Sequence, residues 1–437
     1  MKSFFSKLIV NWLRFTAQLQ LMKVQPLVIG VTGSAGKTSC VQAIGVVLSQ
    51  KTKLKVGRKG NSETGIPMEI LGIKVGTYSG YDWVNVCLQA LWQLCTNWER
   101  YDTLVLEMGI DSDQLPKNMS HQLSIVQPQI GVLLSISGVH GQNFSGKDIL
   151  QSIANEKGKL LKSLDASGVA IYSLDYSQIL KLVPHIIAKK LTFSSNKSSA
   201  DLQLIKHELS LSGTTFTFLH EQTTHSLHFS KQLHFKESFG TFASAILVGL
   251  EFGITVEESC HKLSQNFQLQ PGRMSVIEGR NNSIIIDSSY NSSLEPTSAA
   301  LRMLDLLPGR KIAVLGDMRE LGALAQHDHQ ELAKQAAKSA NIIVLIGPLT
   351  SQYTLSQLQQ LNFSDKNLMS FANAYQAIDT LQEMIRPNDI ILVKGSQNTI
   401  FLEIIVKALM KHPDQSSALL CRQTPFWERQ RLQLKRS

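Results

Sequence analysis

The sequence predicts an α/β protein with two successive domains. The first would have a parallel sheet and a small antiparallel section, and the second would have another parallel sheet. Three observations support this fold class. Apolar runs of strand length alternate with stretches long enough for crossover helices. A glycine-rich loop follows the first of these runs. The 437 residues, 43% of them apolar, exceed one typical domain of roughly 100 to 200 residues.

The N-terminal segment, residues 1–26, has the periodicity of a helix, because apolar residues recur at three- and four-residue steps: Phe5, Leu8, Ile9, Trp12 and Leu13. No window has the 18 or so consecutive apolar residues that a membrane-spanning helix requires. Two interpretations remain open. The helix docks on the protein's own body, or residues 1–22 make peripheral contact with a membrane.

The next 244 residues, 27–270, form the predicted central domain. An apolar run at 27–31 leads into the glycine-rich loop, and an apolar-periodic stretch at 40–48 predicts a helix. Buried parallel strands are expected at 103–106, 130–136 and 169–174. Alternation of apolar and polar residues between Asp201 and Phe235 predicts antiparallel hairpins, followed by a helix at 239–252.

The third segment, 271–412, repeats the α/β alternation after the turn residues Pro271 and Gly272, and it predicts a Rossmann-like domain. Its expected strands and helices follow one another as residues 284–286, 298–307, 312–315, 330–339, 342–346, 374–384, 390–393 and 400–411. The remainder, 413–437, is expected to be a basic tail.

The charge is concentrated at the two ends of the chain. Residues 1–26 and 421–437 together carry +8 of the formal net charge of +9. We therefore expect solvated basic ends and no nucleic-acid partner, because the body of the chain is nearly neutral. The five cysteines show no metal-ligand spacing and are typical of reduced thiols in a cytoplasmic protein.

The glycine-rich loop GVTGSAGKTS has the strand-loop-helix context of a P-loop. Glycines allow backbone N–H groups to surround phosphate oxygens, a lysine can reach the terminal phosphates, and a hydroxyl can ligate Mg²⁺. The loop departs from the generic pattern at Val31, where glycine is usual. The expected ATP-binding residues are Gly33, Ser34, Ala35, Gly36, Lys37, Thr38 and Ser39.

Two further residues follow predicted parallel strands, where the ligand crevice of such a sheet lies. Glu107 ends the strand LVLE, and His140 lies in the loop after another strand. Carboxylate and imidazole groups are competent metal ligands. Lys157 lies on a predicted helix, where an ammonium would repel Mg²⁺. Each residue taken alone is equally compatible with a structural role.

The variant loop, together with GNSETGIP at 60–67, Glu107, His140 and Lys157 in this order, resembles the Mur ligase family, whose members form amides with ATP. In that family the lysine that matches Lys157 is carbamylated and becomes an anionic metal ligand. The resemblance therefore implies ATP and Mg²⁺ as cofactors. It implies catalytic roles for Lys37, Lys157, His140 and Glu107, with Mg²⁺ held by Thr38, Glu107, His140 and the Lys157 carbamate.

Motifs in the third segment resemble the branch of the family that joins D-alanyl-D-alanine to a UDP-muramoyl tripeptide. They are PGRM, IIIDSSYNSSLEPTSAAL, VLGDMRELG and ILVKGS. By this resemblance Arg273 would contact an ATP phosphate, while Asp287, Tyr290 and Asn291 would line the nucleotide. Asp317 and Lys394 would lie on the amine side. For Asp317 a solvated loop is the alternative.

Several departures from the family pattern bear on the substrate. Only 26 residues precede the first strand, so the family's uridine-nucleotide-binding first domain is expected to be absent. The usual His-Asn pair is missing from KESFGTFASA, Lys159 stands where an acid is usual, and Gln397 replaces an arginine. We therefore expect weaker recognition of adenine and leave recognition of UDP open.

The predicted function is ATP-dependent peptide ligation in peptidoglycan precursor synthesis, by a cytoplasmic and membrane-associated monomer. The carboxylate substrate would be a muropeptide and the amine D-alanyl-D-alanine. One alternative is a Mur-type ligase acting on another carboxylate, such as a lipid-linked muropeptide, a poly-amino-acid or a folate. A second alternative is a P-loop protein that binds nucleotide as a scaffold or switch. The intact set of Lys37, Thr38, Glu107, His140 and Lys157 speaks against the latter.

Overall fold

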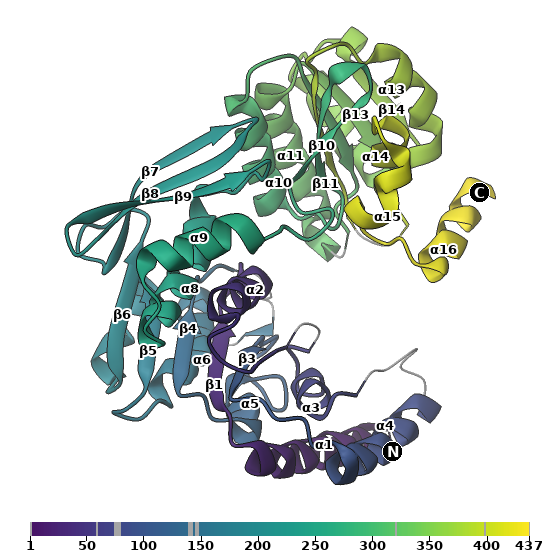
Figure 1. The fold of residues 1–437 in the computed structure, drawn as a ribbon. Helices are drawn as coiled ribbons and strands as arrows, with labels where there is room; N and C mark the ends of the chain where they lie inside the picture. The colour runs from purple at the N-terminus through teal and green to yellow at the C-terminus, as the bar shows by residue number, and fades with distance from the viewer. Residues whose placement is uncertain are drawn as a thin grey trace. The chain divides into compact units, whose positions relative to one another are not determined.

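The computed structural model describes residues 2–57, 60–73, 80–138, 143–144, 148–319, 321–396 and 399–436. The chain divides into two compact units (Figure 1). Unit 1 comprises Met1–His207, Phe216–His228 and Lys236–Phe267, and unit 2 comprises Glu208–Thr215, Phe229–Phe235 and Gln268–Ser437. None of the helices in the described ranges is both long enough and apolar enough to cross a membrane.

The larger sheet contains nine strands within the described part of the chain, in the order β2-β3-β1-β4-β5-β6-β7-β8-β9. Pairing is parallel from β2 to β7. The strands, in chain order, are β1 Leu27–Thr32, β2 Leu54–Val56, β3 Thr103–Glu107, β4 Ile130–Leu133, β5 Val169–Ser173, β6 Lys189–Ser194, β7 Leu202–Ser210, β8 Gly213–His220 and β9 Thr223–Ser230.

Strands β7 to β9 form the predicted hairpin section. Glu221 and Gln222 connect β8 to β9, and both have positive φ angles of 45° and 66°. Two central residues with positive φ are the signature of a type I′ turn, which joins antiparallel strands. Residues at the end of β7 and after β9 belong to unit 2, where Leu233 is part of the apolar core and Leu209 and Phe235 pack against it.

Helices of unit 1 bury the central strands of this sheet. Apolar residues of α3, α5 and α6 join those of β3, β4 and β5 in one buried cluster, while α2, α8 and α9 pack against each other. The helices are α1 Lys2–Val24, α2 Lys37–Leu48, α3 Gly65–Leu71, α4 Gly80–Thr96, α5 Met119–Ile125, α6 Ile149–Lys162, α7 Ser177–Leu180, α8 Phe239–Glu251 and α9 Val256–Asn266.

The N-terminal helix α1 docks on unit 1, as one of the two interpretations expected. Leu13 and Ala17 are fully buried, and the Trp12 indole donates a 3.1 Å hydrogen bond to the backbone oxygen of Cys87 on α4. Of the periodic apolar residues, Ile9, Trp12 and Leu13 pack in this contact, whereas Phe5 and Leu8 are exposed. The helix thus has an apolar face on each side.

Unit 2 is a six-stranded sheet in the described residues, with the order β10-β11-β15-β12-β13-β14. Only the edge strand β10 pairs antiparallel. Alternate residues of β12 enter two different cores: Ala313 and Leu315 face α10 and α11, whereas Ile312 and Val314 face α13 and α14. Burial on both faces explains why these strands are continuously apolar in sequence.

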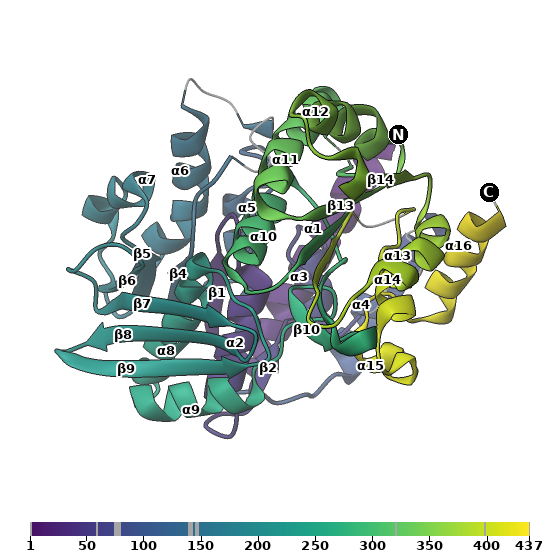
Figure 2. The same cartoon turned by 90° about the horizontal axis from the view of Figure 1, so that it is seen from above.

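Figure 2 shows these two helix pairs on opposite sides of the sheet. The strands are β10 Ser275–Glu278, β11 Ile284–Ser288, β12 Lys311–Gly316, β13 Ile342–Ile346, β14 Leu368–Phe371 and β15 Ile390–Lys394. The helices are α10 Leu294–Leu306, α11 Ala325–Ser339, α12 Leu355–Gln360, α13 Ile378–Met384, α14 Glu403–Leu409, α15 Ser416–Leu419 and α16 Pro425–Arg436.

Candidate active site

The phosphate-binding loop lies between β1 and α2, as predicted. Gly33 and Gly36 have φ angles of 152° and 81°, which side-chain-bearing residues rarely adopt. A Cβ atom at Gly33 would also lie only 3.0 Å from the Cβ of Leu134. No side chain caps the N-terminus of α2, and its first turn contains no acid. The first N–H groups of the helix are therefore open to an anion.

Glu107 links this loop to the next strand. It is the last residue of β3 and pairs in register with Val31 of β1. The Thr38 hydroxyl donates to one of its carboxylate oxygens at 2.7 Å, and the Asn61 amide donates to the other at 2.9 Å. The hydroxyl and the carboxylate thus converge at the carboxyl end of the parallel strands, where ligands of such sheets bind.

An open pocket adjoins these groups within unit 1. It is lined by Gly33, Ser34, Lys37, Asn61, Ser62, Glu63, Gly109, Ile110, Asp111, Lys117 and Lys157. Asp111 and Lys117 were not predicted from the sequence, because no motif marks them and only the fold brings their loop to the pocket. Asn61 lies in the GNSETGIP motif at 60–67, but the sequence did not indicate a role for it. Its position beside Glu107 depends on the turn that precedes α3.

Two lysines meet at this pocket. The Lys37 ammonium donates to the backbone oxygen of Gly33 at 3.0 Å, and burial lowers its pKa. Lys157 is only 5% exposed, and burial together with the neighbouring Lys37 charge lowers its pKa to about 7. Lys157 therefore holds a large fraction of neutral amine at neutral pH, which makes it nucleophilic.

Lys159, on the same helix as Lys157, has a structural role. Its ammonium lies 2.6 Å from a carboxylate oxygen of Glu156 and donates to the Ser120 hydroxyl at 3.0 Å. The other Glu156 oxygen accepts the N–H of Met119 at 2.9 Å. Lys159, which replaces the family's usual acid, is thus engaged in fastening α6 to α5.

His140 lies outside the described residues, so its predicted role is not located by the structure. Within the described ranges, no group of three or more His, Cys, Asp and Glu side chains is arranged to hold a metal ion.

A second polar cluster lies in unit 2, at the carboxyl ends of β11 and β15. The Lys394 ammonium donates to the Ser288 hydroxyl at 3.2 Å and to the Asn291 backbone oxygen at 3.0 Å. Asp287 is fully buried, and its carboxylate accepts the N–H of Ser289 at 3.0 Å. Burial raises the pKa of Asp287 to about 6 and lowers that of Lys394 to about 8.

Arg273, which is half-buried, and Tyr290, which is exposed, form the rim of this cluster. The Arg273 guanidinium lies 4.6 Å above the centre of the Tyr290 ring, a cation–π contact. Gly272 positions the pair, since its φ is 77° and its backbone oxygen accepts the Tyr290 N–H at 3.1 Å. Arg273, Asp287, Tyr290, Asn291 and Lys394 are thus brought together as neighbours on one side of unit 2.

Asp317 is buried rather than part of a solvated loop. It is 2% exposed, and one of its carboxylate oxygens accepts the N–H and the hydroxyl of Thr350 at 2.8 Å and 3.1 Å. Its backbone oxygen also accepts the N–H of Ser396. In unit 2 these contacts hold the loops after β12 and β15 together.

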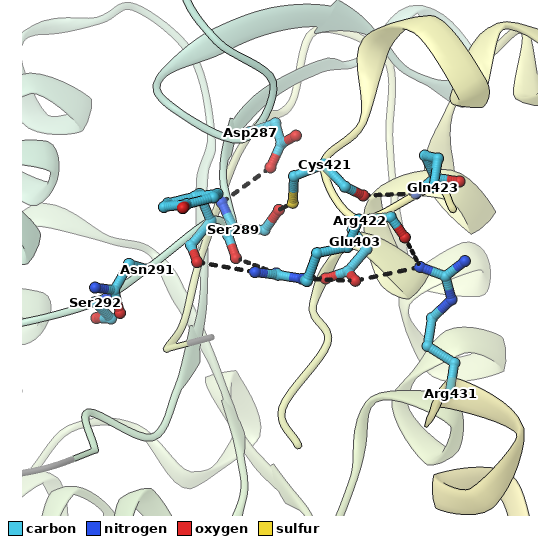
Figure 3. A network of polar contacts seen from close by, with 10 residues as sticks. Asp287, Ser289, Asn291, Ser292, Glu403, Cys421, Arg422, Gln423 and Arg431 are labelled. Carbon is cyan, nitrogen blue, oxygen red and sulfur yellow. Dashed lines mark hydrogen bonds and ion pairs between the residues drawn. The ribbon is translucent and has the colours of Figure 1, made fainter. Parts of the chain in front are cut away.

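The C-terminal segment contributes a residue that the sequence did not reveal. Arg422, expected on a solvated tail, has a side chain that is 4% exposed and forms a two-pronged ion pair with Glu403 at 2.7–2.9 Å (Figure 3). It also donates to the backbone oxygens of Ser289 and Tyr290 at 2.7 Å and 2.9 Å. Only the fold shows this contact, because a basic tail looks the same in sequence whether solvated or buried.

A phosphate-binding loop in one parallel sheet and a basic and acidic cluster at the strand ends of a second sheet are typical of a nucleotide-binding α/β protein. Residues 31–234 match the Mur ligase middle domain, and residues 272–397 match the glutamate ligase domain of Mur ligases. The chain belongs to the Mur ligase family.

Individual members of the family are similar to this chain over most of its length. The chain is 25% identical to UDP-N-acetylmuramoyl-tripeptide–D-alanyl-D-alanine ligase of Escherichia coli K12, over 89% of this chain and 78% of the relative. It is 26% identical to the Bacillus subtilis 168 ligase of the same name, over 91% and 79%. The crystal structure of MurF ligase from Thermotoga maritima with ADP superposes with a TM-score of 0.72 at 22% identity, covering 93% of this chain and 84% of that one.

Proposed function

We propose that this chain is an ATP-dependent, ADP-forming peptide ligase that joins D-alanyl-D-alanine to the terminal carboxylate of a muropeptide during peptidoglycan precursor synthesis. The observation that carries the proposal is the pocket of unit 1, which Lys37 and Lys157 line together with Gly33 of the phosphate-binding loop, while Glu107 accepts a hydrogen bond from Thr38 beside it. The relatives that bear this name extend over most of the chain and support the same reaction.

The proposed reaction has two steps. A carboxylate oxygen of the muropeptide attacks the γ-phosphorus of ATP, which releases ADP and leaves an acyl phosphate. The amine of D-alanyl-D-alanine then attacks the carbonyl carbon, and phosphate leaves with the original carboxylate oxygen. Negative charge moves between oxygens in both steps, so positioned cations supply most of the catalysis. We propose that Lys37, whose ammonium lies at the loop, supplies one of these cations.

The side chains at the pocket fit Mg²⁺, which prefers oxygen ligands. Thr38 and Glu107 supply a hydroxyl and a carboxylate that lie 2.7 Å apart. Lys157 fits only as a carbamate, because its ammonium form is cationic. Its lowered pKa of about 7 favours the neutral amine that reacts with carbon dioxide. Bound Mg²⁺ would neutralise charge on the phosphates, and His140 is the further proposed ligand.

In unit 2 we propose that Arg273 binds an ATP phosphate and that Asp287, Tyr290 and Asn291 line the nucleotide. Arg273 supports this role because its buried Nε has no hydrogen-bond partner among the described residues. Lys394 and Asp317 are proposed for the amine side. Asp317 would act by position, because its carboxylate is occupied by Thr350.

The domain limits and location are further parts of this proposal. Residues 27–270 would be the ATP-binding domain and 271–412 the domain for the amine, in a cytoplasmic monomer. We also propose that residues 1–22 bring the ligase to a membrane surface.

A phosphate-release screen tests the proposed function. The full chain, ATP and Mg²⁺ are combined with a UDP-muramoyl tripeptide, its lipid-linked form, or a folate, each with D-alanyl-D-alanine or single amino acids. We expect phosphate release only when a muropeptide and D-alanyl-D-alanine are both present. Release with a folate and glutamate would transfer the chain to another branch of the family. Hydrolysis that is indifferent to any amine would contradict ligation.

A further inference from the structure

The outer surface of helices α1 and α4 is unusually apolar for a protein surface. Of the twenty large apolar side chains that are exposed in the described residues, nine belong to α1, α4 or Trp98 just after α4. Single exposed apolar residues are common on proteins, whereas a contiguous group marks a site of interaction. The catalytic pocket does not use this surface, because none of these residues lines it.

On α1 the exposed apolar residues form a stripe. Leu8, Phe15 and Met22 are spaced seven residues apart, which places them on one side of the helix, and they are 50%, 52% and 70% exposed. The opposite side carries Leu13 and Ala17, which are fully buried. Docking on unit 1 therefore explains one side of α1, whereas Leu8, Phe15 and Met22 on its second apolar side stay at least half exposed in the part of the chain that the structure describes.

Helix α4 repeats this arrangement. Val84, Leu88, Leu91 and Trp92 follow the helical repeat and are 48–68% exposed, while Val86 on the opposite side is buried. The helices lie side by side at the base of Figure 1.

The two stripes face the same direction. Trp12 contacts the backbone of Cys87, and Lys23 contacts that of Leu94, so the two helices run parallel. On each helix, these contacting positions lie between the buried side and the exposed stripe. Two parallel helices that touch along these flanks present their stripes on one continuous surface, which we call the α1–α4 apolar face.

The charges around this face are basic. Lys7 is exposed and Arg14 half-buried, and both lie on the flank of α1 beside its stripe. In the described residues of α1 and α4 the one acidic side chain is Asp82, which lies about 200° around α4 from Val84 at 100° per residue. At the other end of α1, the Lys23 ammonium lies 4.2 Å above the ring of Trp98, which is 66% exposed.

We propose that the α1–α4 apolar face docks on the surface of an anionic lipid bilayer. The exposed aliphatic side chains and tryptophans of the face match the apolar boundary of such a membrane. The basic flank of α1 matches its negatively charged headgroups. A second copy of the chain fits less well. A two-fold contact through this face would bring the basic flanks of the two copies close together, with no acidic side chains among the described residues of the face to pair them. The inference concerns the location of the proposed ligase and does not depend on its chemistry.

Vesicle flotation of the full chain tests the proposal. We expect the protein to float with vesicles of phosphatidylethanolamine and phosphatidylglycerol, and to bind phosphatidylcholine vesicles less, with high salt weakening the binding. The variant Leu88→Glu/Trp92→Glu is expected to lose binding by at least about tenfold, because two exposed apolar side chains that would enter the bilayer are replaced by charge. Leu306→Glu, at a residue of unit 2 that is 72% exposed, is the matched control and should float like the wild type.

Thermal unfolding of each variant verifies that the fold is retained, since every substituted side chain is exposed. The proposal is overturned if the wild type does not float with anionic vesicles, or if the double variant floats equally well. It is also overturned if sedimentation shows a dimer that the double variant dissociates while vesicle binding is absent. Flotation needs neither ATP nor substrate, so failure of the proposed ligation leaves this test unaffected.

Discussion

At the scale of single residues, Lys157 is the clearest case in which burial changes the charge state of a proposed catalytic group. Its amine is buried beside Lys37, and its pKa is lowered from 10.5 to about 7. Between these two pH values the unfolded chain holds a proton that the folded chain has released, so stability rises with pH across this window. Below pH 7 the folded protein carries the full cost of a buried ammonium.

This cost leads to a prediction for Lys157→Met, which removes the charge and keeps an unbranched apolar side chain. We expect the variant to unfold at a higher temperature than the wild type at pH 6, by roughly 2–4 °C for each kcal/mol gained. The difference should shrink as the pH rises from 7 to 10.5. Ligation should be lost, because no carbamate can form. A stability difference that grows with pH would refute the account of this lysine.

Lys37→Ala provides a second prediction at this scale. We expect a fall of roughly 10²–10³-fold in kcat, because a cation aimed at the phosphates is removed. The effect on stability should be small, since among the described residues the hydrogen bond lost is the one to the Gly33 oxygen. Single-turnover kinetics and thermal unfolding measure the two effects. A variant that ligates like the wild type would exclude Lys37 from the phosphate site.

Sequence motifs predicted well those site residues that lie in the motifs themselves. They did not predict the residues that the fold brings to the pocket from other parts of the chain. The positions of Lys37, Thr38 and Glu107 followed from strand ends and a glycine loop, which are local features. Asp111 reaches the pocket only through a loop whose path depends on the packing of α5. Such a position leaves no periodic or compositional signal in the sequence.

At the scale of secondary-structure elements, the C-terminal segment fastens the loop after β11. Arg422 bridges α14 and this loop through Glu403 and the backbone oxygens of Ser289 and Tyr290. Arg431 on α16 approaches the same carboxylate at 3.4 Å. The segment therefore supports Tyr290, one of the residues proposed to line the nucleotide.

We predict that Arg422→Ala destabilises unit 2 by about 3–5 kcal/mol, because Glu403 is left as a buried charge with a weaker partner. The KM for ATP should also rise, since the loop that carries Tyr290 loses its anchor. Urea unfolding and steady-state kinetics measure the two effects. Arg429→Ala, an exposed arginine on the same segment, serves as the control. Equal effects of the two substitutions would show that the segment does not support the loop.

Elements with strong periodic patterns were predicted closely. The strand expected at 342–346 is β13, and the helix expected at 239–252 is α8 Phe239–Glu251. The periodic pattern did not predict the ends of elements correctly where burial depends on residues that are distant in the sequence. The predicted strand 130–136 ends at Leu133, since the chain then turns toward the phosphate loop, where Ser34 bonds Ser135. Edge strand β10 and helix α4 were not predicted, because β10 has only four residues and α4 carries apolar residues on both its buried and its exposed side, which obscures the helical period.

At the scale of the whole molecule, each unit contributes one cluster of charged side chains at the carboxyl ends of its parallel strands. Unit 1 holds the phosphate loop with Lys37 and Glu107, and unit 2 holds Asp287 and Lys394. The expectation of a parallel α/β fold in both halves is confirmed by the strand pairings. The N-terminal helix docks on unit 1, as one interpretation expected, whereas the C-terminal end, expected to be solvated, provides a buried arginine.

The central claim is that a substrate carboxylate is activated as an acyl phosphate. The most direct measurement uses UDP-muramoyl tripeptide labelled with ¹⁸O in its terminal carboxylate, together with ATP, Mg²⁺ and D-alanyl-D-alanine. Mass spectrometry of the released phosphate should find one ¹⁸O atom per phosphate, and the new amide should retain the other. Unlabelled phosphate released together with the ligated product would contradict the account.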